Sequence, residues 1–169
     1  MMKKIENNST LDLKVFLEKL ENFSVGSNNQ VSLSAAAYGV SVGDNLPLDL
    51  VSQLFPSIKA EEVKVKSVSV ENMVNRVNES IPYIENKLGD FSPASGHSPN
   101  SQPVQPQFDY IKAAEEYWDM VSKCVDYKTA EVWEISLPSN VAHVFWYFYF
   151  VVYNPKQNIC LFLTGGADD

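Results

Sequence analysis

One apolar run constrains the fold of this chain more than any other feature. Residues 141–154 are Val-Ala-His-Val-Phe-Trp-Tyr-Phe-Tyr-Phe-Val-Val-Tyr-Asn, with no glycine and no proline. Such a run of β-branched and aromatic residues predicts a pleated strand. A turn cluster at 154–158 and a second apolar run at 159–163 follow it. The two runs together therefore predict a β-hairpin.

The two faces of this predicted strand differ in character, because successive side chains point to opposite faces. Even positions carry apolar side chains such as Trp146 and Phe148, which predict the face packed on the core. Odd positions carry Tyr147, Tyr149 and Tyr153, here called the tyrosine face. Neither face is charged, so either a second layer covers the tyrosines or they form an exposed aromatic patch typical of protein interfaces.

Hydrophobic spacing predicts the remaining elements. Helices are expected over residues 10–21, 31–42, 47–55, 71–88 and 108–125, and further strands over 62–70 and 131–137. The assignment of 31–42 is ambiguous, because its alanines favour a helix while its ends alternate like strands. The lysines of 62–70 predict a strand at a sheet edge, where such residues prevent unwanted pairing.

These elements predict an α+β fold in a single domain of residues 1–169. N-terminal helices are expected to pack on one face of a C-terminal antiparallel β-meander. Residues 90–107 are rich in proline, serine, glutamine and asparagine, which predicts a flexible connector within the domain. Its Pro-x-x-Pro stretch at 103–106 has no flanking arginine, so a groove-binding motif is the minor interpretation.

The sequence contains no strong catalytic or metal-binding motif, and no cofactor or metal is expected. Cys124 and Cys160 lack metal or redox spacing, so they are expected to be buried, reduced thiols. His143 is interpreted as a core or cross-strand residue, and His97 as a surface residue of the connector. The glycine pair at 165–166 lacks a following helix, so it is interpreted as a frayed tail and not as a phosphate loop.

The net charge of −8 limits the classes of partner. An acidic surface repels phosphate backbones, so no nucleic-acid binding is expected, whereas a basic protein would be attracted. The N-terminus has no apolar segment typical of a signal peptide, and 141–153 is too short for a membrane-spanning helix. A cytoplasmic protein is therefore expected.

The densest group of carboxylates is predicted to form the partner-binding surface together with the tyrosine face. It comprises Glu115, Glu116, Asp119, Glu131 and Glu134. A solvated helix face explains the same spacing without any function, and acid–base catalysis would require two of these groups in one cleft.

In size, acidity and lack of a catalytic set, the chain resembles the small immunity and antitoxin proteins of bacteria. The resemblance implies a non-enzymatic inhibitor that occludes the active site of a basic toxin, often a nuclease. The alternative is a small-ligand-binding or enzymatic α+β domain, with a pocket in the curved sheet near His143, lined by Trp133, Tyr147 and Tyr149. A phage-encoded or structural accessory protein is a third possibility.

Overall fold

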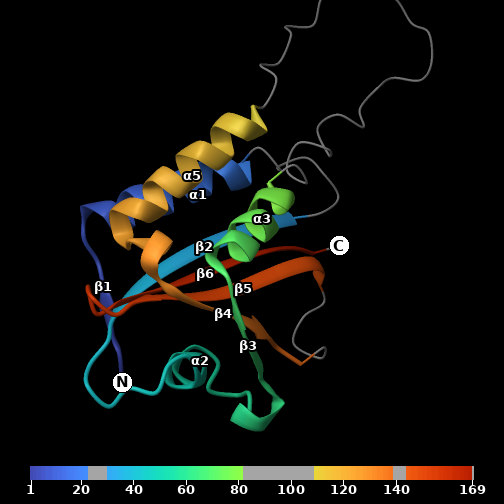
Figure 1. The fold of residues 1–169 in the computed structure, drawn as a ribbon. Helices are drawn as coiled ribbons and strands as arrows, with labels where there is room; N and C mark the ends of the chain where they lie inside the picture. Colours follow the sequence, from blue (N-terminus) through green and yellow to red (C-terminus); the bar gives the residue numbers. More distant parts are fainter. Residues whose placement is uncertain (23–29, 82–108, 139–143, 169) are drawn as a thin grey trace, which may run out of the picture.

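The predicted hairpin forms the centre of a six-stranded antiparallel sheet (Figure 1). The computed structural model describes residues 1–22, 30–81, 109–138 and 144–168. The strand order is β1-β2-β6-β5-β4-β3. The strands are β1 (Lys3–Ile5), β2 (Gln30–Gly39), β3 (Lys64–Val68), β4 (Glu131–Ser136), β5 (Val144–Asn154) and β6 (Ile159–Asp168). The α+β fold expected from the sequence is confirmed.

The turn between β5 and β6 is held by the buried side chain of Asn154. Its Oδ1 accepts hydrogen bonds from the backbone N–H groups of Lys156 and Gln157, at 3.0 and 3.1 Å. Its Nδ2 donates to the carbonyl oxygen of Asp126 at 2.8 Å and to the hydroxyl of Thr129 at 3.1 Å. One side chain therefore shapes the turn and ties it to η2 (Tyr127–Thr129), the short 3-10 helix that precedes β4.

Helices cover both faces of the sheet (Figure 1). One face carries α1 (Asn8–Asn22), α3 (Val70–Ser80) and α5 (Tyr110–Cys124), while α2 (Leu48–Leu54) lies against the other. A second 3-10 helix, η1 (Ala60–Glu62), lies between α2 and β3. Polar side chains cap the N-termini of three helices. The side chains of Asn7, Ser69 and Asp109 accept hydrogen bonds from the backbone N–H groups of Thr10, Asn72 and Lys112, respectively.

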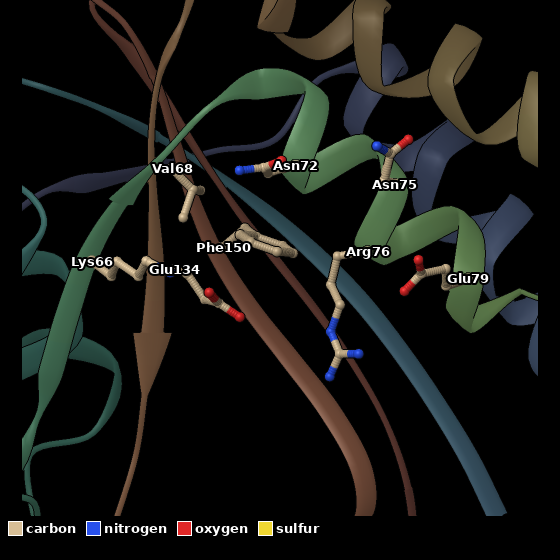
Figure 2. A pocket seen from close by; sticks show the side chains of 8 residues that line it. All are labelled: Lys66, Val68, Asn72, Asn75, Arg76, Glu79, Glu134 and Phe150. Atoms are coloured by element: carbon tan, nitrogen blue, oxygen red, sulfur yellow. The ribbon is translucent and has the colours of Figure 1, made fainter.

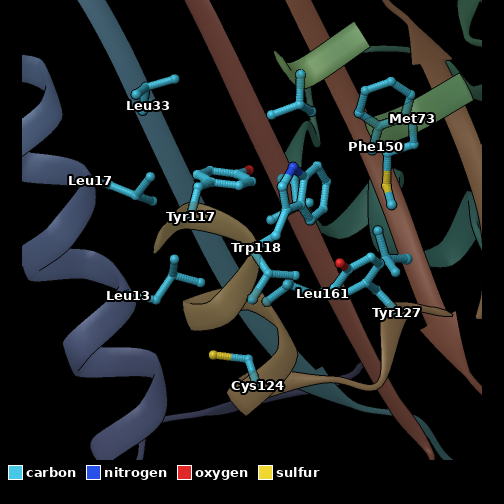
Figure 3. Packing of buried hydrophobic residues seen from close by; sticks show 14 of the residues in the cluster. Leu13, Leu17, Leu33, Met73, Tyr117, Trp118, Cys124, Tyr127, Phe150 and Leu161 are labelled. Carbon is cyan, nitrogen blue, oxygen red and sulfur yellow. The ribbon is translucent and has the colours of Figure 1, made fainter. Parts of the chain in front are cut away.

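Each covered face has its own apolar cluster. The first includes Leu13, Leu17, Leu20, Met73, Val77, Trp118, Val121, Phe148, Phe150, Val152, Leu161 and Leu163. The second includes Tyr38, Leu50, Val51, Ile135, Leu137, Val151, Cys160 and Phe162. Figure 3 shows the first cluster, in which Tyr117 and Trp118 of α5 lie between α1 and the sheet. The even positions Phe148, Phe150 and Val152 of β5 belong to the first cluster, as predicted.

The prediction of a helix over 31–42 is wrong. Strand β2 pairs with β6 along all 10 of its residues, from Gln30 opposite Asp168 to Gly39 opposite Ile159. Ala37 packs in the first cluster and Tyr38 in the second, as alternation along a strand requires. The helix propensity of alanine amounts to less than about 1 kcal/mol per residue, so a full ladder with β6 overrides it.

The interpretation of 165–166 as a frayed tail is also wrong, because both glycines lie within β6. The other predicted elements are found near their expected positions, including the edge strand β3. Helix α3 confirms the apolar stripe of the 71–88 prediction as far as Ile81. The remainder of that helix and the 90–107 connector lie outside the described residues. No helix in the described part of the chain is long and apolar enough to cross a membrane.

We predict that Gly165→Ala destabilises the fold. A Cβ atom at this position would lie 2.5 Å from Cε1 of Phe148 and 2.9 Å from Cδ2 of Leu33, both in the packed core. The overlap must displace buried side chains, so the free energy of unfolding in urea should fall by about 1–3 kcal/mol.

Gly39→Ala is the matched control, because the nearest atom to its added Cβ is the carbonyl oxygen of Lys3 at 3.9 Å. Its free energy of unfolding should change by no more than about 0.5 kcal/mol. Equal stability of the two variants would contradict the close packing of β6 against Phe148.

Candidate functional site

The tyrosine face is partly covered by α2 and the residues that follow it. The ring of Phe55 meets that of Tyr149 edge-on, with centroids 6.0 Å apart, and that of Phe162 at 6.1 Å. Tyr147 lies beside Tyr149 with centroids 5.4 Å apart, and both are half-buried, as is Tyr153. The face is thus neither an open aromatic patch nor a fully buried one.

The predicted acidic residues are distributed over separate surfaces. Glu115, Glu116 and Asp119 are exposed on the wet side of α5. Glu131 lies opposite Tyr153 in the β4–β5 ladder, on the same side of the sheet as the tyrosine face. Glu134 points to the other side, toward α3. The structure therefore places Glu131 beside Tyr153, at one end of the tyrosine face, and separates both from the carboxylates of α5.

Two of the three α5 carboxylates are engaged in local ion pairs. Oε1 of Glu116 lies 3.9 Å from Nζ of Lys112, and Oδ2 of Asp119 lies 2.8 Å from Nζ of Lys123. The hydrogen bond and charge of Asp119 raise the pKa of Lys123. Both pairs are exposed to solvent, where such pairs contribute little to stability. Glu115 forms no ion pair within the described part of the chain.

Glu134 lines a cleft between α3 and the edge of the sheet, here called the α3 cleft (Figure 2). Its volume is about 380 Å³. The lining residues are Lys66, Val68, Asn72, Asn75, Arg76, Glu79, Glu134 and Phe150. Lys66 stands opposite Glu134, and Glu134 opposite Phe150, so one cross-strand row of β3, β4 and β5 forms the floor. Four side chains of α3 form the wall.

Arg76 is the arginine of this wall, and no other arginine occurs in the sequence. Its Nη2 donates to the carbonyl oxygen of Tyr147 at 3.5 Å, which is at the long limit for a hydrogen bond. Within the described residues it forms no ion pair, and its side chain is exposed. Most of the guanidinium donors are therefore available to a ligand.

Helix α3 is a firm wall because its inner side is anchored. Met73 and Val77 are fully buried in the first cluster, beside Phe150 and Trp118 (Figure 3). The indole Nε1 of Trp118 in α5 donates a hydrogen bond to Oδ1 of Asn78 at 2.8 Å. This bond joins the two helices behind the cleft.

The sequence pattern does not predict this cleft. Glu134 was predicted to belong to the partner-binding surface, and the lysines of β3 were predicted only to prevent unwanted pairing at a sheet edge. A lone arginine on the wet side of a helix, in a chain with a net charge of −8, is the signal that could have drawn attention to it. The remaining lining residues come together only through the packing of α3 on the sheet.

Neither cysteine is an activated nucleophile. Both are buried, and burial raises the pKa of the Cys124 thiol to about 11 and that of the Cys160 thiol to about 12. The nearby charge of Asp12 raises the pKa of Cys124 further. Both side chains therefore stay protonated at neutral pH. His143, near which the alternative pocket was predicted, lies outside the described residues. Trp133 and Tyr149 belong to the opposite side of the sheet from the α3 cleft.

No group of three or more metal-ligating side chains occurs within the described ranges.

No family model matches the sequence, and no curated protein matches it. Two crystal structures of citrus MAF1 are similar in fold, each at 12% sequence identity. One match covers 90% of this chain and 98% of the MAF1 chain with a TM-score of 0.56, and the other covers 90% and 99% with a TM-score of 0.58. The chain shares its fold with citrus MAF1. At this identity the likeness concerns the arrangement of helices and strands alone.

We predict that the native protein does not react with Ellman's reagent near pH 8, because only thiolates react and both thiols are buried and protonated. Both cysteines should react in urea. Rapid reaction of two thiols in the native protein would contradict the burial of Cys124 and Cys160.

The same thiols should make stability depend on pH. Their pKa values are raised in the folded state, whereas in the unfolded chain both thiols titrate at about 8.5. The unfolded state therefore releases protons first, and the free energy of unfolding should fall as pH rises from about 8 to about 11. Urea titrations at several pH values measure this decline, which should be shallower in a Cys124→Ala/Cys160→Ala variant.

Proposed function

We propose that this protein acts without catalysis, by binding a basic protein through the wet side of α5. The observation that supports this most directly is the exposed group Glu115, Glu116 and Asp119, in a chain with a net charge of −8. Charge of this sign accelerates encounter with a basic surface and disfavours acidic competitors.

The local ion pairs of α5 leave its carboxylates available to a partner. An exposed pair is worth roughly 0–1 kcal/mol, so cationic side chains of a partner can replace Lys112 and Lys123 at little cost. Ile111 lies one helical turn before Glu115 and is 60% exposed, which adds an apolar contact beside the charges. Protein interfaces usually combine apolar contacts with a rim of polar residues.

The finer form of the proposal is the inhibitor function implied by the resemblance to immunity and antitoxin proteins. The partner would then be a basic toxin, and the protein would neutralise it by covering the active site. Burial raises the pKa of both cysteine thiols, so neither is poised to act as a nucleophile, which supports a binding role over cysteine-based catalysis. Cytoplasmic localisation belongs to the same proposal.

We predict that reversing charge on α5 abolishes partner capture. The purified protein would be immobilised and exposed at low salt to an extract of the organism that encodes it, with identification by mass spectrometry. A captured basic protein should bind a Glu115→Lys/Glu116→Lys variant at least about tenfold more weakly, and its association rate should fall steeply with added salt.

Glu61→Lys/Glu62→Lys is the matched control, because it changes the net charge equally on η1, at the exposed end of the α2 layer. Its affinity should stay within about threefold of the native protein. Capture of a partner that is not basic, or equal loss in both variants, would refute the α5 interface. For the inhibitor function, the captured protein must also lose its own activity on binding.

A further inference from the structure

The α3 cleft combines charges of both signs in equal number. Lys66 and Arg76 are cationic, and Glu79 and Glu134 are anionic. In Figure 2 these side chains converge on the space between α3 and the sheet, and their signs alternate from Lys66 through Glu134 and Arg76 to Glu79. The cleft is therefore locally neutral, although the whole chain is strongly acidic.

The charges of the cleft do not neutralise one another by direct pairing. Lys66 and Glu134 are cross-strand partners, and Arg76 and Glu79 are one helical turn apart, yet no ion pair is formed by any of these four groups within the described residues. Elsewhere on the surface, charges at comparable spacing do pair, as Lys14 does with Glu18 at 3.9 Å. These groups therefore remain available to a ligand, and a small number of polar groups that line one pocket can fix the orientation of a bound molecule.

The remaining lining residues supply an apolar floor and neutral polar groups. Phe150 is buried beneath the cleft and Val68 is half-buried beside it. Asn72 and Asn75 present amides that can donate and accept hydrogen bonds. A volume of about 380 Å³ lies within the range of about 300–1,000 Å³ in which proteins bind small molecules.

We propose that the α3 cleft binds a small zwitterion, a molecule with a carboxylate, an ammonium group and a short aliphatic side chain. Arg76 would hold the carboxylate by paired N–H donors, with Lys66 adding positive charge. Glu134 would accept hydrogen bonds from the ammonium group, and Phe150 and Val68 would contact the aliphatic part.

The balance of charge favours a zwitterion over a simple ion. An anion alone would bind Arg76 but would also face the carboxylates of Glu79 and Glu134. A cation alone would bind those carboxylates but would face Lys66 and Arg76. A ligand with both charges can place its carboxylate beside Lys66 and Arg76 and its ammonium group beside Glu79 and Glu134, so that each charge of the cleft gains an opposite charge as its neighbour. The free α-amino acids are the class that this geometry fits.

Isothermal titration calorimetry with L-leucine and two analogues tests the proposal. The analogues are 3-methylbutylamine, which lacks the carboxylate, and 4-methylpentanoate, which lacks the ammonium group. Leucine should bind at least about tenfold more tightly than either, which corresponds to about 1.4 kcal/mol. Absence of leucine binding at millimolar concentration, or equal binding of an analogue, would overturn the proposal.

A blocked dipeptide, N-acetyl-Lys-Glu-amide, separates a free zwitterion from a charged segment of polypeptide. It carries both charges on side chains and should bind more weakly than leucine. Tighter binding of the dipeptide than of leucine would overturn the assignment to a small zwitterion in favour of a peptide.

Two charge-removing variants distinguish ligand contacts from structural roles. Arg76→Gln should weaken leucine binding about tenfold and shift relative preference toward the amine. Glu134→Gln should shift preference toward 4-methylpentanoate. Circular dichroism would verify folding of each variant. The two opposite shifts would not arise from a general loss of structure.

Lys64→Gln is the matched control, because Lys64 is exposed on the same strand and the same side of the sheet as Lys66 but does not line the cleft. Leucine affinity should be unchanged in this variant. An equal loss in Lys64→Gln and Arg76→Gln would show that general surface charge, and not the cleft, determines binding. None of these substitutions alters α5, so failure here leaves the basic-partner proposal intact.

Discussion

The pairing of β5 with β6 is the interaction on which the rest of this structure depends. The two strands pair from Val144 opposite Asp168 to Asn154 opposite Ile159, and their central residues are apolar on both faces. An antiparallel pair of this kind cannot leave either face in water, so it requires a layer on each side. Helices α1, α3 and α5 supply one layer, and α2 with Phe55 supplies the other.

The unequal size of these layers explains where the candidate sites lie. Helix α2 has 7 residues and leaves Tyr147 and Tyr149 half-buried at one end of the sheet. Helix α3 crosses the outer strands after Ser69 and leaves the α3 cleft above Lys66, Glu134 and Phe150. The tyrosine face and the α3 cleft thus both arise where a covering helix leaves part of the sheet uncovered.

Charged residues behave differently on the two candidate surfaces. On α5 they pair within one helix at a spacing of four residues, as sequence spacing alone indicates. In the α3 cleft they come from β3, β4 and α3, and they remain apart. Local spacing therefore predicts the first surface but not the second. The cleft depends on the β3–β4 register and on the anchoring of α3 by Trp118 and Asn78.

The pattern of apolar residues was sufficient to predict the central hairpin, the helical stripes and the α+β class, because each depends on periodicity within one segment. The lysines of β3 were sufficient to predict its edge position. Periodicity could not decide the state of 31–42, since its alanines favour a helix while its ends alternate like strands, and only pairing with β6 selects the strand. The same pairing places Gly165 against Phe148 and makes an apparent tail part of the core. The sequence by itself determined which faces must be buried. Tertiary structure alone decided how completely each face is covered, because coverage depends on contacts between segments far apart in the chain. For the same reason, only the tertiary structure places Glu134 in one cleft with Arg76, away from the carboxylates of α5.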